Sequence, residues 1–221
     1  MTGRLLERYR RYRYAWLFAA LLATFGARPV LEAFGSERDP FHWLVAASLC
    51  VAALGLARER GMRWLVVLAA VFVVVRGAQA ALAAEPARAY EVLLWTAGLA
   101  LAAVACVRHA LGAGRVDAER IFAALDAYLL AALLFGVAYW ALDRSQPGSF
   151  AGAVGADGLD IREAIYLSFV TIASLGYGDL VPRSEGARGL AVFEVVGGQM
   201  YLVVLVARLV SLYAREKDGG T

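Results

Sequence analysis

The sequence predicts an all-α membrane protein with six transmembrane helices. Of its 221 residues, 61% are hydrophobic, whereas a soluble domain contains about half. The mean hydropathy is +0.62, and the apolar residues are gathered into blocks rather than scattered along the chain. A helix needs roughly 20 mostly apolar residues to cross a bilayer. Each spanning block must be helical, because lipid offers no hydrogen-bond partners to an open backbone.

Six blocks of the sequence are candidates for these helices. In chain order they cover 14–34, 41–57, 62–84, 90–107, 121–142 and 190–213, and the second is short. We expect the first to be a retained helix, because it is longer than a signal peptide and has no clear small-residue cleavage site. The fourth carries no charge from 92 to 107, so the four-helix domain over 14–107 lacks the arginine repeat of a voltage sensor.

Arginine counts predict the orientation of the spans, because cytoplasmic loops carry an excess of Lys and Arg. Five arginines precede the first span, three lie around the second connection and three in the linker 108–120, whereas the first and third connections carry one each. Both short ends, 1–13 and 215–221, are therefore expected in the cytoplasm, with no regulatory domain there. We expect a multi-pass protein of the inner membrane of a GC-rich bacterium, given the single lysine and the abundant Ala, Arg and Leu.

The connection from 143 to 189 is unusual, because it must lie outside yet carries four arginines. Its first part, 145–158, is rich in Gly and Ala and is typical of a loop. The stretch 161–173 that follows is apolar but too short to span a bilayer, which indicates a re-entrant helix. Such backbone persists at membrane depth only where protein buries it or water borders it. The connection is therefore expected to enter the membrane and line a pathway.

The motif that follows the short helix carries the function. It reads Ser-Phe-Val-Thr-Ile-Ala-Ser-Leu-Gly-Tyr-Gly-Asp-Leu-Val-Pro over 168–182. This resembles the pore signature of the potassium channel superfamily, T-x-x-T-x-G-Y-G-D, and the likeness covers the chain from the fifth span to its end. The resemblance implies a pore domain over 121–214, with an outer helix 121–142, a pore helix 161–173, a filter 174–179 and an inner helix 190–213. It also implies a homotetramer, because each chain supplies one strand of the filter wall.

The chemistry of a potassium filter explains these residue types. Stacked rings of backbone carbonyls replace the water around the ion, which requires a backbone that alternates in handedness. Glycine reaches positive φ freely, so alternate glycines at 176 and 178 fit. By resemblance, the K⁺ ligands are the backbone carbonyls of Ser174, Leu175, Gly176 and Tyr177. The Ser174 hydroxyl would supply the innermost layer of ligands. The aromatic ring of Tyr177 is expected to pack behind the filter. Gly178 completes the filter, and no other cofactor is expected.

The sequence departs from the commonest filter pattern at two positions. Serine at 174 replaces threonine and leucine at 175 replaces valine, so K⁺ selectivity is expected to survive in softened form. Val170 stands where some bacterial channels have a glutamate partner for the filter aspartate. We therefore expect Asp179 to pair with Tyr166, and Thr171 to support the filter from the pore helix.

Ionisable residues inside the spans are expected to be paired or functional, because charge is costly at membrane depth. Glu194 is predicted to hydrogen-bond the back of the pore helix at Ser168 or Thr171, with a proton sensor as the alternative. Asp126 and Arg208, near the cytoplasmic ends of the fifth and sixth spans, are predicted to form a salt bridge.

The inner helix carries a glycine pair, Gly197 and Gly198. By resemblance, Gly198 stands where the superfamily has a gating hinge, and close helix packing explains the pair equally well. Gln199 is expected to face the cavity below the filter. Three further residues continue that face at helical spacing and are predicted to form an apolar constriction: Leu202, Val206 and Val210.

Other functions fit the sequence less well. The basic charge flanks apolar blocks, which argues against nucleic-acid binding, and the lone cysteines at 50 and 106 imply no metal site. An intramembrane aspartyl protease could use a G-x-G-D motif, but its second carboxylate, Asp126, is expected near the opposite membrane face from Asp179. The chain is therefore predicted not to be an enzyme. A potassium transporter subunit and a non-selective cation channel remain closer alternatives. Membrane lipid is the other expected partner.

Overall fold

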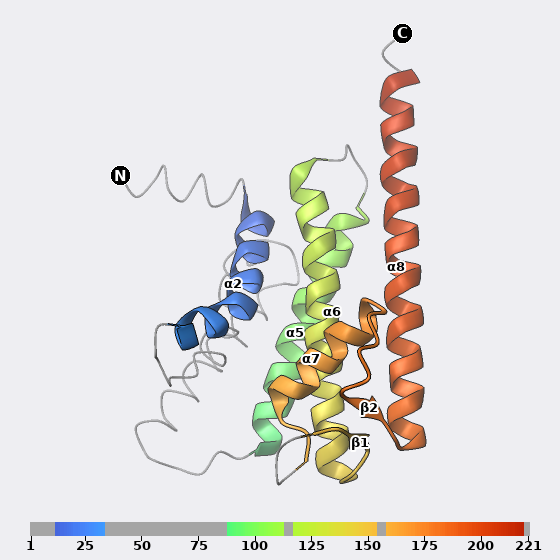
Figure 1. Cartoon of the computed structure of the whole chain (residues 1–221). Helices are drawn as coiled ribbons and strands as arrows, with labels where there is room; N and C mark the ends of the chain where they lie inside the picture. Colours follow the sequence, from blue (N-terminus) through green and yellow to red (C-terminus); the bar gives the residue numbers. More distant parts are fainter. Residues whose placement is uncertain (1–11, 34–87, 113–116, 154–157, 219–221) are drawn as a thin grey trace, which may run out of the picture. The chain divides into compact units, whose positions relative to one another are not determined.

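The computed structural model describes residues 12–33, 88–112, 117–153 and 158–218. Five helices and two short strands lie in these ranges (Figure 1). They are α2 (Arg13–Ala33), α5 (Arg88–Ala110), α6 (Ala118–Ser145), β1 (Phe150–Ala151), α7 (Ile161–Ile172), β2 (Val181–Pro182) and α8 (Glu185–Asp218). The chain divides into two compact units, Met1–Leu129 and Leu130–Thr221, and α6 runs from one into the other.

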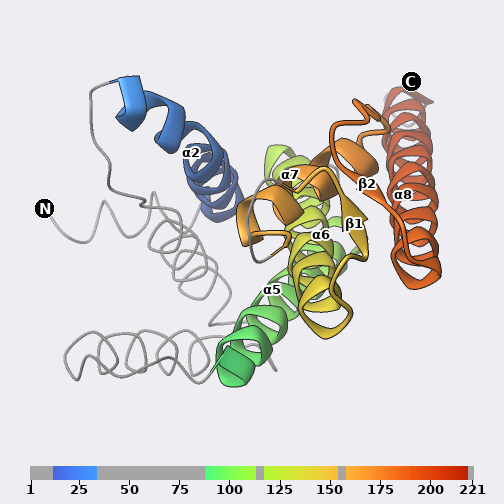
Figure 2. The ribbon, with the colours of Figure 1, turned by 60° about the horizontal axis from the view of Figure 1, so that its bottom comes forward.

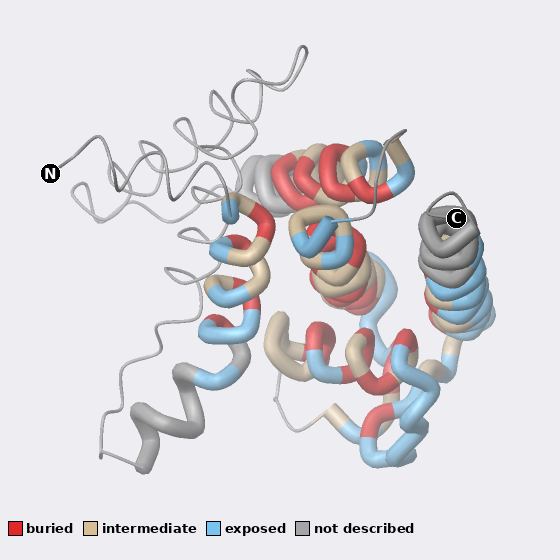
Figure 3. Tube along the Cα trace, turned by 90° about the horizontal axis from the view of Figure 1, so that it is seen from above, coloured by how far each residue is buried: buried red, intermediate tan, exposed pale blue. Residues whose placement is uncertain are grey.

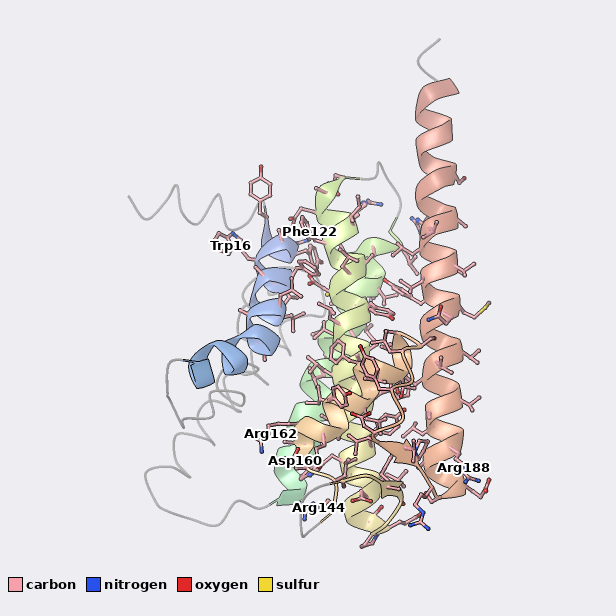
Figure 4. All side chains as sticks on the ribbon, viewed as in Figure 1. Trp16, Phe122, Arg144, Asp160, Arg162 and Arg188 are labelled. Atoms are coloured by element: carbon pink, nitrogen blue, oxygen red, sulfur yellow. The ribbon has the colours of Figure 1, made fainter. Side chains whose placement is uncertain are left out.

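The first unit packs aromatic side chains where its helices meet. The Tyr14 ring of α2 stacks on His109 of α5 at 4.4 Å, and Phe18 lies 5.6 Å from Phe122 of α6 (labelled in Figure 4). The backbone N–H of Tyr14 donates to the Glu119 carboxylate at 3.0 Å. Helices α2 and α5 stand at the predicted first and fourth spans, whereas the second and third predicted spans, 41–57 and 62–84, lie outside the described residues.

The second unit places a short helix and a small two-stranded sheet between two long helices. Helix α7 and the turn that follows it pack on α8, and β1 pairs antiparallel with β2 (Figure 2). Helices α6, α7 and α8, strand β1 and two loop residues contribute to one core cluster of seven buried residues: Tyr139, Phe150, Leu159, Ala164, Leu167, Leu180 and Ala187. This core fixes α7, and therefore the segment that follows it, against the rest of the unit.

Helix α7 begins at Ile161 because a capping box satisfies its first turn. The Asp160 carboxylate accepts the backbone N–H groups of Arg162 and Glu163, and Glu163 in return accepts the N–H of Asp160. The helix ends at Ile172 with Ala173 as its C-cap, so it closes one residue before the predicted end.

Two helices of the described part are long and apolar enough to cross a membrane, Ala118–Ser145 and the Glu185–Arg208 part of α8. The whole helices α6 and α8 extend beyond the predicted bounds 121–142 and 190–213, because polar end residues continue the helical backbone. Half of the apolar window of α6 is buried (50%), against 11% for α8. Figure 3 shows this contrast, with most of the described part of α8 exposed. Helix α8 therefore leaves an apolar surface unpartnered in the single chain.

Candidate functional site: the filter segment and its supports

The segment after α7 has a backbone that alternates in handedness. Ser174, Gly176 and Gly178 have φ angles of 57°, 59° and 82°, whereas no positive φ occurs at Leu175 or Tyr177 between them. Ser174 is the one non-glycine residue with positive φ in the described ranges, and such a conformation costs roughly 1–3 kcal/mol. The alternation is the geometry that brings successive carbonyl groups to one side of a strand. The sequence predicted this alternation from Gly176 and Gly178, and the structure extends it to Ser174.

The inner end of this segment is fixed by hydrogen bonds from both helices. The backbone N–H groups of Ser174 and Leu175 donate to carbonyl oxygens of the last turn of α7 at 2.9 and 2.8 Å. From α8, the amide nitrogen of Gln199 donates to the Ile172 carbonyl and to the Ser174 hydroxyl oxygen, each at 3.1 Å. Gln199 therefore reaches the base of the filter segment itself, which is closer than the cavity position predicted from the sequence.

The outer end is fixed through Asp179. The Tyr166 hydroxyl of α7 donates to the Asp179 carboxylate at 2.7 Å, so the pairing expected from the sequence is present. This hydrogen bond holds the pKa of Asp179 below its ordinary value and raises the pKa of the Tyr166 hydroxyl. Tyr177 is 67% exposed, so its ring does not pack behind the filter within the single chain. That packing stays a prediction for an assembly.

Glu194 of α8 is fully buried behind α7 and accepts hydrogen bonds from two helices. Ser168 of α7 is one donor, as predicted, and Tyr139 of α6 is the other. The Thr171 side chain hydrogen-bonds the same Tyr139 hydroxyl, and Ser168 also lies 2.6 Å from the Ala132 carbonyl oxygen. These groups form a buried network that ties α6, α7 and α8 together immediately behind the filter.

The glycine pair of α8 divides into two different environments. A Cβ atom on Gly198 would lie 2.5 Å from the Ile172 side chain, whereas one on Gly197 would meet nothing within 4 Å. Gly198 therefore permits the close approach of α8 to the end of α7. Helix α8 runs without interruption through both glycines, so the gating hinge stays a prediction.

The predictions for the apolar constriction and for Asp126 remain untested by the single chain. Leu202 is partly buried and Val206 is 58% exposed in the single chain, and Val210 lies outside the residues whose side chains are described. Asp126 belongs to the first unit, where it is fully buried and its carboxylate oxygens have no hydrogen-bond partner among the described residues. Because Arg208 belongs to the second unit, the salt bridge between the two residues stays a prediction.

Two further contributors were not predicted from the sequence. Tyr139 lies in the apolar stretch 129–142 of α6, where a hydroxyl group indicates a buried hydrogen-bond partner. Gly152 lies against the backbone of Asp179, at a place where no side chain would fit. Nothing in the local sequence indicates that approach, because it depends on the pairing of β1 with β2.

Comparison with known proteins shows what the sequence of this region is similar to. Residues 127–215 match the family described as "Ion channel". The chain is 31% identical over 84 residues to "Two pore potassium channel c" of Oryza sativa subsp. japonica, covering 38% of this chain and 18% of that protein. It is 29% identical over 96 residues to "Inward rectifier potassium channel Kirbac3.1" of Paramagnetospirillum magnetotacticum, covering 42% of this chain and 29% of that protein. No solved structure matches the chain significantly.

The chain thus spans less than a third of the length of these relatives, and the family match lies in its C-terminal part. They are matches to channels and not to enzymes, which removes the aspartyl protease alternative. Together with the filter motif, these matches support the assignment of residues 127–215 to the pore-loop family of the potassium channel superfamily.

Proposed function

We propose that this protein is a potassium-selective channel that conducts K⁺ passively across the inner membrane. The single observation that carries this proposal is the alternation of positive φ at Ser174, Gly176 and Gly178. A backbone of this kind presents a row of carbonyl oxygens, which are the ligands that replace the hydration shell of K⁺. The oxygens come from Ser174 to Tyr177.

The supports of the filter segment would hold such a row of carbonyl oxygens in place. Gln199 and the last turn of α7 fix the inner end, and Tyr166 fixes the outer end through Asp179. The C-terminal end of α7 carries partial negative charge, which favours a cation in front of it. A filter fixed at both ends would not need to rearrange each time K⁺ enters or leaves.

The proposal requires four copies of the chain, because one strand cannot surround an ion. The exposed apolar surface of α8 supports an assembly of this kind. Its large side chains are 52–70% exposed in the single chain: Val192, Phe193, Val196, Met200, Val203, Val204 and Val206. In a tetramer, parts of this surface would face neighbouring subunits, the central cavity and lipid. Leu202, Val206 and Val210 would then form the apolar constriction.

The membrane arrangement follows from the positions of charge. We place both termini in the cytoplasm and the β1–β2 end of the pore domain outside, with six spans in all. Arg144, Asp160, Arg162 and Arg188 gather at that end of the second unit (labelled in Figure 4), where an aqueous surface would solvate them. The first four spans lack a voltage-sensor repeat, so little voltage dependence is proposed from them.

A non-selective cation channel is the second candidate, and the residues that favour it are Ser174 and Leu175. Both depart from the commonest filter sequence, although neither removes a carbonyl. A transporter subunit is a weaker candidate, because this chain has one complete Gly-Tyr-Gly segment.

The test is cation flux into liposomes that contain the purified full chain, driven by a K⁺ gradient and repeated with Na⁺. The proposal predicts K⁺ flux without Na⁺ flux, abolished by Gly176→Asp. Gly148→Asp is the matched control, since Gly148 also has positive φ (81°) and open space around it but lies outside the filter. Equal flux of both ions would sink selectivity and favour the non-selective channel. Flux that survives Gly176→Asp would refute the filter assignment.

A further inference from the structure

We propose that Asp143 and Gly152 are positioning residues that fix the outer end of the filter from behind. Together with Ser149 they form a clasp, defined here as the contacts that connect the end of α6 to the residues just after the filter. The inference rests on the proposed channel function, because it assigns these residues a part in keeping the filter conductive. These contacts connect α6 to Asp179 by a route that does not pass through the pore helix.

The clasp begins at Asp143, whose buried carboxylate closes the loop between α6 and α7. One oxygen accepts the backbone N–H of Ser149 at 3.1 Å, and the other accepts the N–H of Leu159 at 2.8 Å. A Cβ atom on Gly158 (φ 88°) would lie 2.5 Å from the second oxygen, so that position also depends on glycine. One side chain therefore connects two points of the loop, Ser149 and Leu159, that are ten residues apart.

Ser149 carries the connection from the loop to the segment after the filter. Its carbonyl oxygen accepts the backbone N–H groups of Arg183 and Ser184 at 2.7 and 3.2 Å. The adjacent strands extend this contact, with Phe150 opposite Pro182 and Ala151 opposite Val181. Because Val181 comes two residues after Asp179, the strand pair leaves little freedom at the outer end of the filter.

Gly152 makes the last contact, directly against the filter backbone. Its φ is 93°, and a Cβ atom there would overlap the carbonyl oxygen of Asp179 and lie 3.0 Å from its carbonyl carbon. The overlapping atoms are backbone, so a side chain at position 152 would force either the end of the filter or the β1 segment to move. Asp179 is thus fixed twice, through its side chain by Tyr166 and through its backbone by Gly152.

Gly152→Ala in the full-length chain tests the clasp, with Gly148→Ala as the matched control. Both positions have positive φ, at 93° and 81°, but only Gly152 has atoms in the place of a Cβ. The comparison therefore separates overlap with the filter from backbone strain. Asp143→Asn is a milder second variant, because its amide nitrogen cannot accept one of the two backbone N–H groups.

Two readouts keep the clasp distinct from the channel function. Amide hydrogen exchange of the purified protein follows the N–H groups of Arg183 and Ser184, and liposome K⁺ flux follows how long the filter conducts. We expect Gly152→Ala to raise exchange at both amides at least tenfold over Gly148→Ala and to shorten the duration of flux. Asp143→Asn should give an intermediate effect on both.

Each outcome decides the proposal. Equal exchange and equal flux in Gly152→Ala and Gly148→Ala would overturn the clasp. Raised exchange with an unchanged time course of flux would leave the contacts in place but refute their part in positioning the filter. If the unmodified protein carried no K⁺ flux, the channel proposal and the positioning role would both fall, while the exchange contrast would still show whether the contacts exist.

Discussion

Replacing Tyr139 by phenylalanine removes one hydroxyl from the buried network behind the filter and leaves the ring in place. In the structure, this hydroxyl donates to Glu194, which is fully buried and has Ser168 as its other partner. Without it, one oxygen of Glu194 is buried and unsatisfied, which costs roughly 1–3 kcal/mol. For a chain of this size, each kcal/mol lowers the unfolding midpoint by about 2–4 °C. We therefore expect Tyr139→Phe to lower the midpoint by several degrees in detergent.

The same network predicts how Glu194 itself responds. The Ser168 hydroxyl has one proton and two neighbouring acceptors, the Ala132 carbonyl and Glu194. An amide at position 194 can donate to Ser168 and accept from Tyr139, so Glu194→Gln is expected to keep most of the stability that Glu194→Ala loses.

Tyr166→Phe is the matched control for the stability measurement. It also removes a tyrosine hydroxyl from a carboxylate, but Tyr166 is 39% exposed, so water can replace its hydrogen bond. Thermal unfolding followed by circular dichroism measures all four variants. The reasoning is refuted if Tyr139→Phe unfolds at the temperature of the unmodified protein, or if Tyr166→Phe is destabilised as much.

Three further predictions concern the filter and its two helices. Gly198→Ala is expected to destabilise the pore domain by about 1–3 kcal/mol through overpacking against α7. Gly197→Ala is expected to have no such effect, because nothing lies within 4 Å of its Cβ position. Chemical unfolding compares the two variants, and equal losses of unfolding free energy would contradict the packing. The Tyr166 bond lowers the pKa of Asp179, so its stabilisation is complete above the ordinary value of 3.8 and is lost as the pH falls through the lowered pKa. Loss of K⁺ flux at acid external pH should therefore begin at higher pH in Tyr166→Phe, and an unchanged pH profile would refute the coupling. Asp160→Ala is expected to lower the free energy of unfolding by about 0.5–2 kcal/mol, because it removes the N-cap of α7. Asp160→Asn should retain most of that stability. Equal midpoints of thermal unfolding for the two variants would contradict the capping role.

Much of the pore domain could be predicted from the sequence because its signals are local. The start of α7 after Asp160 and the glycines at 176 and 178 depend on neighbouring residues alone. The Tyr166–Asp179 pair was predictable because thirteen residues separate its members within one short motif. Helix ends were less accurate, since hydrophobicity marks the apolar part of a helix and not the polar turns that continue it.

The contacts that sequence reasoning missed join distant segments. Tyr139 and Glu194 are 55 residues apart, and their meeting depends on how α6 and α8 are rotated about their axes. Gly152 meets Asp179 only because β1 and β2 pair in one register. The positive φ of Ser174 was also unpredicted, because a side chain disfavours that conformation and only the surrounding hydrogen bonds maintain it.

The most direct test of the account is the reversal potential of the reconstituted protein in a planar bilayer, with K⁺ on one side and an equal concentration of Na⁺ on the other. A filter of stacked carbonyls predicts a reversal potential displaced strongly from zero, in the direction of the K⁺ equilibrium potential. A reversal potential at zero would contradict K⁺ selectivity and show that the alternating backbone from Ser174 to Gly178 does not distinguish the two ions.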